Sequence, residues 1–70
     1  MTRTNKAALL ERITVNPKIM TGKPTIRQTR LTVEHLLKAL AAGLTFEDLK
    51  ADFSFLEKDD LNACLLYAAA

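Results

Sequence analysis

The segment TIRQTRLTVEHLL, residues 25–37, changes within a few positions from strand-like alternation to a leucine-rich helical pattern. In its first half, Ile26 is expected to face inward and Arg27 outward, which is the period-two pattern of a half-buried strand. In its second half, apolar side chains recur at helical spacing from Val33, which predicts a helix over residues 33–42. The joint between this strand and this helix carries two arginines and decides the fold.

The joint cannot be a regular strand. Ile26 and Leu31 are separated by an odd number of positions, so a strand would place their side chains on opposite faces. We expect both side chains in the core, and this requires a bulge or turn near Gln28 and Thr29.

A second strand is predicted upstream, over residues 12–16, where Ile13 and Val15 alternate with polar side chains. The strand ends where residues 17–24 supply two prolines and a glycine, which are typical turn residues. Residues 12–28 are therefore expected to form an irregular β-hairpin.

The remaining sequence contains helix start and stop signals. Thr32 is placed to cap the first helix, and Gly43 lies where a left-handed residue would end it. Thr45 and Asp48 have the spacing of a capping box for a second helix. The predicted helices cover residues 33–42, 46–52 and 58–68.

The 70 residues are enough for one small domain, and 49% of them are apolar, which excludes a disordered chain. We expect a mainly α fold, a three-helix helix-turn-helix bundle of homeodomain-like or winged-helix-like type with a short N-terminal β-hairpin. Residues 1–11 are expected to be a mobile segment and residues 12–70 the single domain. No apolar stretch approaches the roughly 20 residues of a membrane span or resembles a signal peptide, so we expect a cytoplasmic chain.

Charge divides the chain into two halves. Residues 1–30 contain seven basic residues and one acidic residue, a net charge of +6, whereas residues 31–70 contain three basic and seven acidic residues, a net charge of −4. This asymmetry is typical of a basic arm for a polyanion, although ordinary solvated surface charge explains it equally well. A two-stranded ribbon can enter a DNA groove, so we predict DNA binding by four residues of the arm. These residues are Lys18, Lys23, Arg27 and Arg30.

No catalytic or metal site is predicted. The single histidine, His35, and the single cysteine, Cys64, have no companion at the spacing of a nucleophile pair or a zinc site. Asp59 and Asp60 are adjacent on a predicted helix and point about 100° apart, so their carboxylates do not face each other. Cys64 is expected in the core. We therefore expect a non-enzyme that needs no cofactor.

Residues 12–49, RITVNPKIMTGKPTIRQTRLTVEHLLKALAAGLTFEDL, resemble the prokaryotic domain-of-unknown-function (DUF) family 433. The most specific part of the resemblance is GKPTIRQTRLTV, residues 22–33. The resemblance extends to about Tyr67, and three features depart from the family pattern. Gln28 stands where glycine is usual, Thr32 replaces a common proline, and residues 54–57 stand in place of the family's P-x-L-T before the last helix. If the φ angle of Gln28 stays negative, this residue is tolerable in the turn.

The resemblance implies a helix-turn-helix-like domain that acts as the antitoxin of a type II toxin–antitoxin pair, with a PIN-like ribonuclease toxin as its partner. Two functions stay open. In one, a homodimer also binds operator DNA through the basic arm and regulates its own expression. In the other, the chain is purely a protein-interaction module whose acidic and apolar helical half neutralises the ribonuclease. For such a partner surface we predict Phe55, Asp59 and Asp60.

Two further expectations concern the hairpin. We expect Arg30 to stabilise the strand-to-helix joint and Arg27 to face a ligand, because Arg30 lies just before the predicted Thr32 cap. We also expect Ile13, Val15 and Ile26 to be buried against a second subunit, since a two-stranded hairpin is only marginally stable in isolation.

Overall fold

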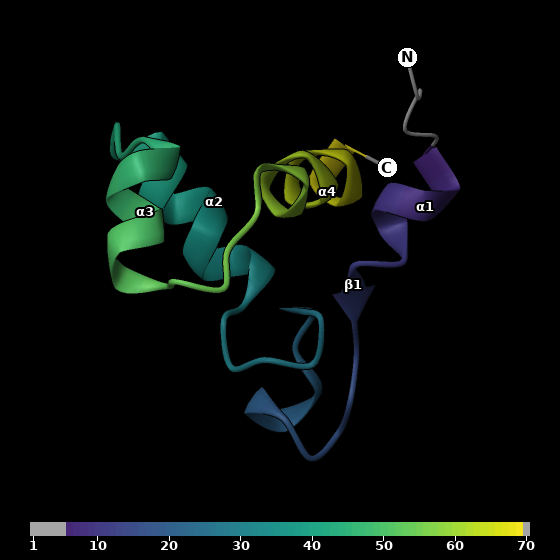
Figure 1. Cartoon of the computed structure of the whole chain (residues 1–70). Helices are drawn as coiled ribbons and strands as arrows, with labels where there is room; N and C mark the ends of the chain where they lie inside the picture. Colours follow the sequence, from purple (N-terminus) through teal and green to yellow (C-terminus); the bar gives the residue numbers. More distant parts are fainter. Residues whose placement is uncertain (1–5, 70) are drawn as a thin grey trace.

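The computed structural model describes residues 6–69. Four α-helices and a two-stranded antiparallel sheet form this part of the chain, so the prediction of a mainly α-helical protein is confirmed. Helix α4 lies between α1 on one side and α2 with α3 on the other (Figure 1). In chain order the elements are α1 (Lys6–Leu10), β1 (Ile13–Thr14), the 3₁₀ turn η1 (Met20–Gly22), β2 (Thr25–Ile26), α2 (Val33–Ala41), α3 (Phe46–Asp52) and α4 (Lys58–Ala69).

The N-terminal helix belongs to the folded unit. Sequence reasoning placed residues 1–11 outside the domain, yet α1 packs against α4, as Figure 1 shows. Residues 1–5 lie outside the described residues, and the expectation of a mobile segment there stays a prediction. Residues Lys6–Leu10 are helical.

The two strands pair as predicted but are shorter than expected. Ile13 lies opposite Ile26, and Thr14 lies opposite Thr25 with the two hydroxyl oxygens 3.3 Å apart. Each strand has only two residues because the chain turns away at both ends of the ladder. On the β1 side, the carboxamide oxygen of Asn16 accepts a hydrogen bond from the backbone N–H two residues later, at 2.9 Å, and starts the turn.

The predicted helix starts are confirmed. The hydroxyl oxygen of Thr32 accepts a hydrogen bond from the backbone N–H of His35 at 3.0 Å. At the start of α3, Thr45 accepts from the N–H of Asp48 at 3.2 Å while the Asp48 carboxylate accepts from the N–H of Thr45 at 2.9 Å, which completes the capping box. These bonds hold the pKa of Asp48 below its ordinary value.

Gly43 ends α2 as predicted. Its φ angle is +93°, a conformation that a residue with a Cβ atom rarely adopts. The N–H of Leu44 then donates to the carbonyl of Ala39 at 3.1 Å, which satisfies one of the last helical carbonyls.

The core lies between β2 and helices α2, α3 and α4. Cys64 is fully buried there, as predicted, and so is Ile26, which sequence reasoning assigned to a contact between two subunits. Of the three residues expected at that contact, only Val15 is exposed, because Ile13 packs against the core of its own chain. The buried cluster consists of Ile26, Leu31, Val33, Leu36, Ala39, Leu49, Leu56 and Cys64.

The predicted turn after β2 is present. The N–H of Thr29 donates to the carbonyl of Ile26 at 2.8 Å, and the two central residues, Arg27 and Gln28, have φ angles of +45° and +63°. The condition under which Gln28 would be unstrained, a negative φ, is therefore not met. Positive φ at both central positions defines a type I′ turn, in which glycine, asparagine and aspartate are favoured.

A buried carboxylate connects this turn to β1 and α4. The Asp60 side chain is fully buried and accepts hydrogen bonds from Nε and Nη2 of Arg27 at 3.1 and 2.9 Å. It also accepts one from Nη1 of Arg12 at 3.0 Å. The backbone N–H of Glu57 donates to the same carboxylate at 2.8 Å, so the third residue of α4 also caps its own helix. We call Arg12, Arg27 and Asp60 the Asp60 triad.

The structure reverses the roles expected for the two arginines. Arg27 turns toward the protein and binds the buried carboxylate, because the positive φ of the turn redirects its side chain. Arg30 is exposed, and its guanidinium makes no hydrogen bond or ion pair with any residue between 6 and 69. Arg27 therefore stabilises the fold, and Arg30 is the side chain that faces solvent.

The Asp60 triad predicts a stability loss and an acid dependence for one substitution. Burial alone would raise the pKa of Asp60, but hydrogen bonds from Arg27, the Glu57 N–H and Arg12 outweigh it and keep the pKa below the ordinary value of about 4. The Asp60 carboxylate therefore binds a proton more readily in the unfolded chain than in the folded one. The stability that Asp60 contributes is present above about pH 4 and is lost as the pH falls further. Asp60→Asn should lower the free energy of unfolding at pH 7 by about 2–3 kcal/mol.

Urea denaturation from pH 7 to pH 3 measures both effects. The difference between the wild type and the Asp60→Asn variant should shrink at the acid end. Arg30→Ala is the matched control and should change stability by less than about 0.5 kcal/mol. Equal losses for Asp60→Asn and Arg30→Ala would contradict the assignment.

The turn predicts a stabilising substitution. Gln28 adopts a left-handed conformation that costs a non-glycine residue about 1–2 kcal/mol, and glycine removes this cost while losing somewhat more chain entropy. Gln28→Gly should therefore raise the free energy of unfolding by about 0.5 kcal/mol, measured by urea denaturation. Gln28→Ala keeps the strained backbone and should give no gain, so a larger gain for alanine than for glycine would refute the explanation.

Candidate functional site

The four residues predicted to bind DNA have different surroundings. Lys18 is exposed in the turn after β1, and Arg30 is exposed in the turn before α2. The ammonium of Lys23 lies 3.6 Å from the carboxylate of Glu34, and Arg27 is held by the Asp60 triad. Two of the four positive charges are thus balanced within the chain.

The predicted partner residues also differ in how far they are buried. Phe55, in the turn between α3 and α4, is 40% exposed. Asp59 is partly exposed in the first turn of α4. Asp60 is fully buried in the triad, so it is not part of a contact surface; the spacing of two adjacent acids on a helix does not reveal that the second one points inward.

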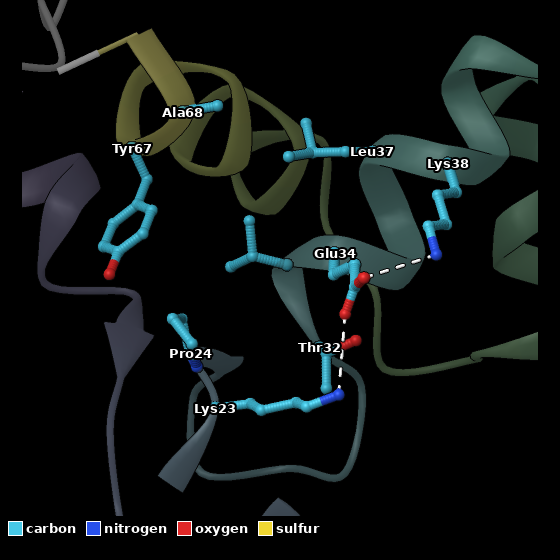
Figure 2. Close-up of a pocket in the computed structure, with 9 residues that line it drawn as sticks. Lys23, Pro24, Thr32, Glu34, Leu37, Lys38, Tyr67 and Ala68 are labelled. Carbon is cyan, nitrogen blue, oxygen red and sulfur yellow. Dashed lines mark ion pairs between the residues drawn. The ribbon is translucent and has the colours of Figure 1, made fainter.

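Two open grooves flank the N-terminal end of α2, and Thr32 lines both of them. The first, which we call the Tyr67 groove, has a volume of about 520 Å³. Figure 2 shows Tyr67 and Ala68 of α4 facing Leu37 of α2 across this groove, with Pro24 at one end. The floor is mainly apolar, which is typical of a surface that binds an apolar side chain.

A chain of ion pairs borders the Tyr67 groove. The Glu34 carboxylate lies 3.3 Å from the ammonium of Lys38 and 3.6 Å from that of Lys23, as the dashed lines in Figure 2 show. The hydrogen bond from Lys38, together with the charges of both lysines, lowers the pKa of Glu34. All three side chains are largely exposed, so these pairs add little stability but give the groove a polar rim.

The second groove, which we call the Phe55 groove, has a volume of about 400 Å³. It brings together Arg30, predicted to bind DNA, and Phe55, predicted to bind a partner. Its lining side chains are Met20, Arg30, Leu31, Thr32, His35, Phe53 and Phe55.

Aromatic rings make up one wall of the Phe55 groove. Phe53 packs edge-on against His35 with ring centroids 5.8 Å apart, and against Phe55 with centroids 6.2 Å apart. The guanidinium carbon of Arg27 lies 6.0 Å from the Phe55 centroid, and Nη2 of Arg27 donates to the Phe55 carbonyl at 2.8 Å. The Asp60 triad therefore fixes the position of this wall through Arg27.

The described residues offer no arrangement for metal binding or thiol chemistry. No group of three metal-ligating side chains gathers among residues 6–69. Burial raises the pKa of the Cys64 thiol to about 12, so the thiolate is scarcely present at neutral pH. Within the same range, no helix has the length and apolar character needed to cross a membrane.

Sequence reasoning missed the groove residues on α4, α2 and η1. Tyr67 has the helical spacing of a core residue, yet it is 39% exposed. Met20 is 40% exposed, and it lies in a turn in which residues 20–22 all have positive φ angles. The TGKP sequence could have indicated an unusual turn, but nothing in the sequence indicates which groove the turn borders.

Comparison with protein-family models matches residues 13–68 to the family described as "Protein of unknown function (DUF433)". The corresponding searches gave no match to a curated protein or to a solved structure. The match extends from β1 to the last turn of α4, so it includes both grooves and two residues of the Asp60 triad, Arg27 and Asp60. The third, Arg12, immediately precedes the match. Because the match covers most of its length, the chain belongs to the DUF433 family.

Proposed function

We propose that this protein is the antitoxin of a type II toxin–antitoxin pair and that it binds a PIN-like ribonuclease through the Tyr67 groove. The observation that carries this proposal is the open apolar surface between α2 and α4, where Tyr67 remains 39% exposed. The resemblance to DUF433 proteins that are regarded as antitoxins supports the kind of partner.

The composition of the Tyr67 groove supports a protein partner. Tyrosine is enriched at protein interfaces because its ring contributes apolar contact while its hydroxyl stays in water. A chain of this size has limited area for a core, so an unfilled apolar groove is a surface that a partner can cover. The ion pairs of Glu34 with Lys23 and Lys38 would form a polar rim around the contact.

Charge supports a basic partner. The segment 31–70 carries a net charge of −4, and Asp59 and Glu57 are exposed or partly exposed at the start of α4. Both acids lie at the opposite end of α4 from Tyr67 and pair with Arg12, so they would act by long-range attraction during association with a basic protein and not by contact in the groove. Asp60 has no part in this proposal, because the triad holds its carboxylate inside the chain.

Copurification with the product of the neighbouring reading frame tests the proposal, which predicts that this product is a PIN-like ribonuclease. The wild-type chain should form a stable complex and restore growth of cells that express the ribonuclease. Tyr67→Ala should weaken the complex at least tenfold, because truncation removes a central aromatic contact. Leu44→Ala is the matched control, since Leu44 is 43% exposed but does not line the groove, and it should leave binding unchanged.

Two outcomes would refute this proposal. One is the absence of any complex between the wild-type chain and that ribonuclease. The other is equal binding by the Tyr67→Ala and Leu44→Ala variants, which would place the contact elsewhere.

We further propose that the protein also binds operator DNA through the basic arm, and that α2, α3 and α4 form a helix-turn-helix arrangement. The exposed side chains of Lys18 and Arg30 support this second function. Lys23 adds to it because its pair with Glu34 is open to solvent and weak. Arg27 has no part in this proposal, because its guanidinium is paired with the Asp60 carboxylate.

The arm predicts a salt dependence for duplex binding. The logarithm of the association constant should fall with the logarithm of salt concentration, with a slope of about −0.9 for each phosphate neutralised. Lys18→Gln and Arg30→Gln should each make the slope shallower by about that amount, as measured by electrophoretic retardation across a salt series. Absence of retardation at low salt, or an unchanged slope in both variants, would rule out duplex DNA binding by the arm.

A further inference from the structure

The Phe55 groove has the charge of an anion-binding surface. Arg30 is exposed, and its guanidinium makes no contact with a carboxylate among residues 6–69. None of the side chains that line the groove is acidic. A guanidinium without an internal partner beside a groove without acids favours an anionic ligand.

The hydrogen-bonding side chains of the groove are Arg30, Thr32 and His35, and all three can donate. Arg30 is a donor only, whereas the hydroxyl oxygen of Thr32, which already accepts from the N–H of His35, and the His35 ring can also accept. A phosphodiester backbone presents acceptors only and can therefore use all three donors. The charged donor, Arg30, favours the anionic phosphate over the neutral groups of a peptide backbone.

The apolar wall supplies a surface for a flat ring. Phe55 is 40% exposed in the turn before α4, where its ring contacts Phe53 edge-on and the Arg27 guanidinium lies over one face, 6.0 Å from the centroid, so a base would use the other face. Met20, also 40% exposed, lies on the same groove and adds a flexible apolar contact. Nucleic acid bases stack on such rings with little regard to sequence.

We propose that the Phe55 groove binds single-stranded nucleic acid, with one unstacked base on Phe55 and a neighbouring phosphate on Arg30. A groove of about 400 Å³ fits one nucleotide, and bases inside a duplex cannot reach a ring in a groove. This site is separate from the Tyr67 groove of the proposed antitoxin contact. It also differs from duplex binding by the arm, which needs phosphate contacts alone.

Fluorescence anisotropy with labelled oligothymidylate and oligouridylate of about 10 nucleotides, a length typical for small single-strand binding domains, tests the proposal. Phe55→Leu keeps an apolar side chain but removes the aromatic face, so it should weaken binding about tenfold. Arg30→Gln should weaken binding about fivefold. Lys6→Gln removes a positive charge from an exposed position on α1, outside the groove and outside the predicted DNA contacts of the arm, and should change single-strand affinity less than about twofold.

Two further probes separate stacking from charge and from peptide binding. Inorganic polyphosphate carries the anionic backbone without bases, and its affinity should not respond to Phe55→Leu. A blocked peptide of alternating glutamate and phenylalanine tests the alternative that the groove receives an acidic protein segment. Amide chemical shifts of the wild-type chain, measured with each probe, locate the site without any variant, and oligothymidylate should shift Arg30, His35, Phe53 and Phe55.

The proposal is overturned if each of the three substitutions changes the affinity for oligothymidylate and the affinity for polyphosphate by the same factor. It is also overturned if the peptide shifts the groove residues and neither oligonucleotide does, which would make the groove a protein contact. Copurification with the ribonuclease tests the Tyr67 groove, whereas fluorescence anisotropy tests the Phe55 groove. Either proposal can therefore fail without the other.

Discussion

The rest of the structure depends on one fully buried carboxylate. Asp60 accepts hydrogen bonds from two arginines that lie 33 and 48 positions before it, and from the backbone N–H that precedes α4. A charge removed from water is tolerated only when its hydrogen-bonding capacity is filled, and here four donors fill it. The last helix, β1 and the turn after β2 are thereby held at one point.

This carboxylate also shapes the surface. It draws Arg27 inward, and Arg27 in turn contacts the ring and the carbonyl oxygen of Phe55. The neighbouring Arg30 finds no such acceptor in the described part of the chain and remains in solvent beside the aromatic wall. Two arginines only three positions apart therefore differ completely in role, because one of them has a buried partner and the other does not.

Local signals made the helical part of the fold predictable. The starts of α2 and α3 depend on hydroxyl and carboxylate caps within three residues, and the end of α2 depends on Gly43, so a short sequence window contains the whole interaction. The same reasoning located the turn between Ile26 and Leu31 from their odd separation. It did not determine the sign of φ at Gln28, because a left-handed turn requires compensation by contacts that the local sequence does not contain.

Long-range contacts made the candidate site unpredictable. The inward direction of Arg27 depends on Asp60, and no spacing rule connects residues so far apart. The exposure of Tyr67 depends on how closely α4 approaches α2, which leaves an open groove where helical periodicity predicts a core residue. Phe55 was singled out because it interrupts the helical pattern, and that signal did correspond to an exposed position.

The sequence separations within the Asp60 triad also have a consequence for the order of folding. Contacts between residues close in sequence form with a small loss of chain entropy, whereas those that close a loop of several tens of residues lose more and form later. The capped helices α2 and α3 can therefore become ordered first, and the triad can be completed only when β1, the turn and α4 have met. Interactions that form after the rate-limiting step govern how fast a protein unfolds rather than how fast it folds. The buried carboxylate would then chiefly lower the rate of unfolding.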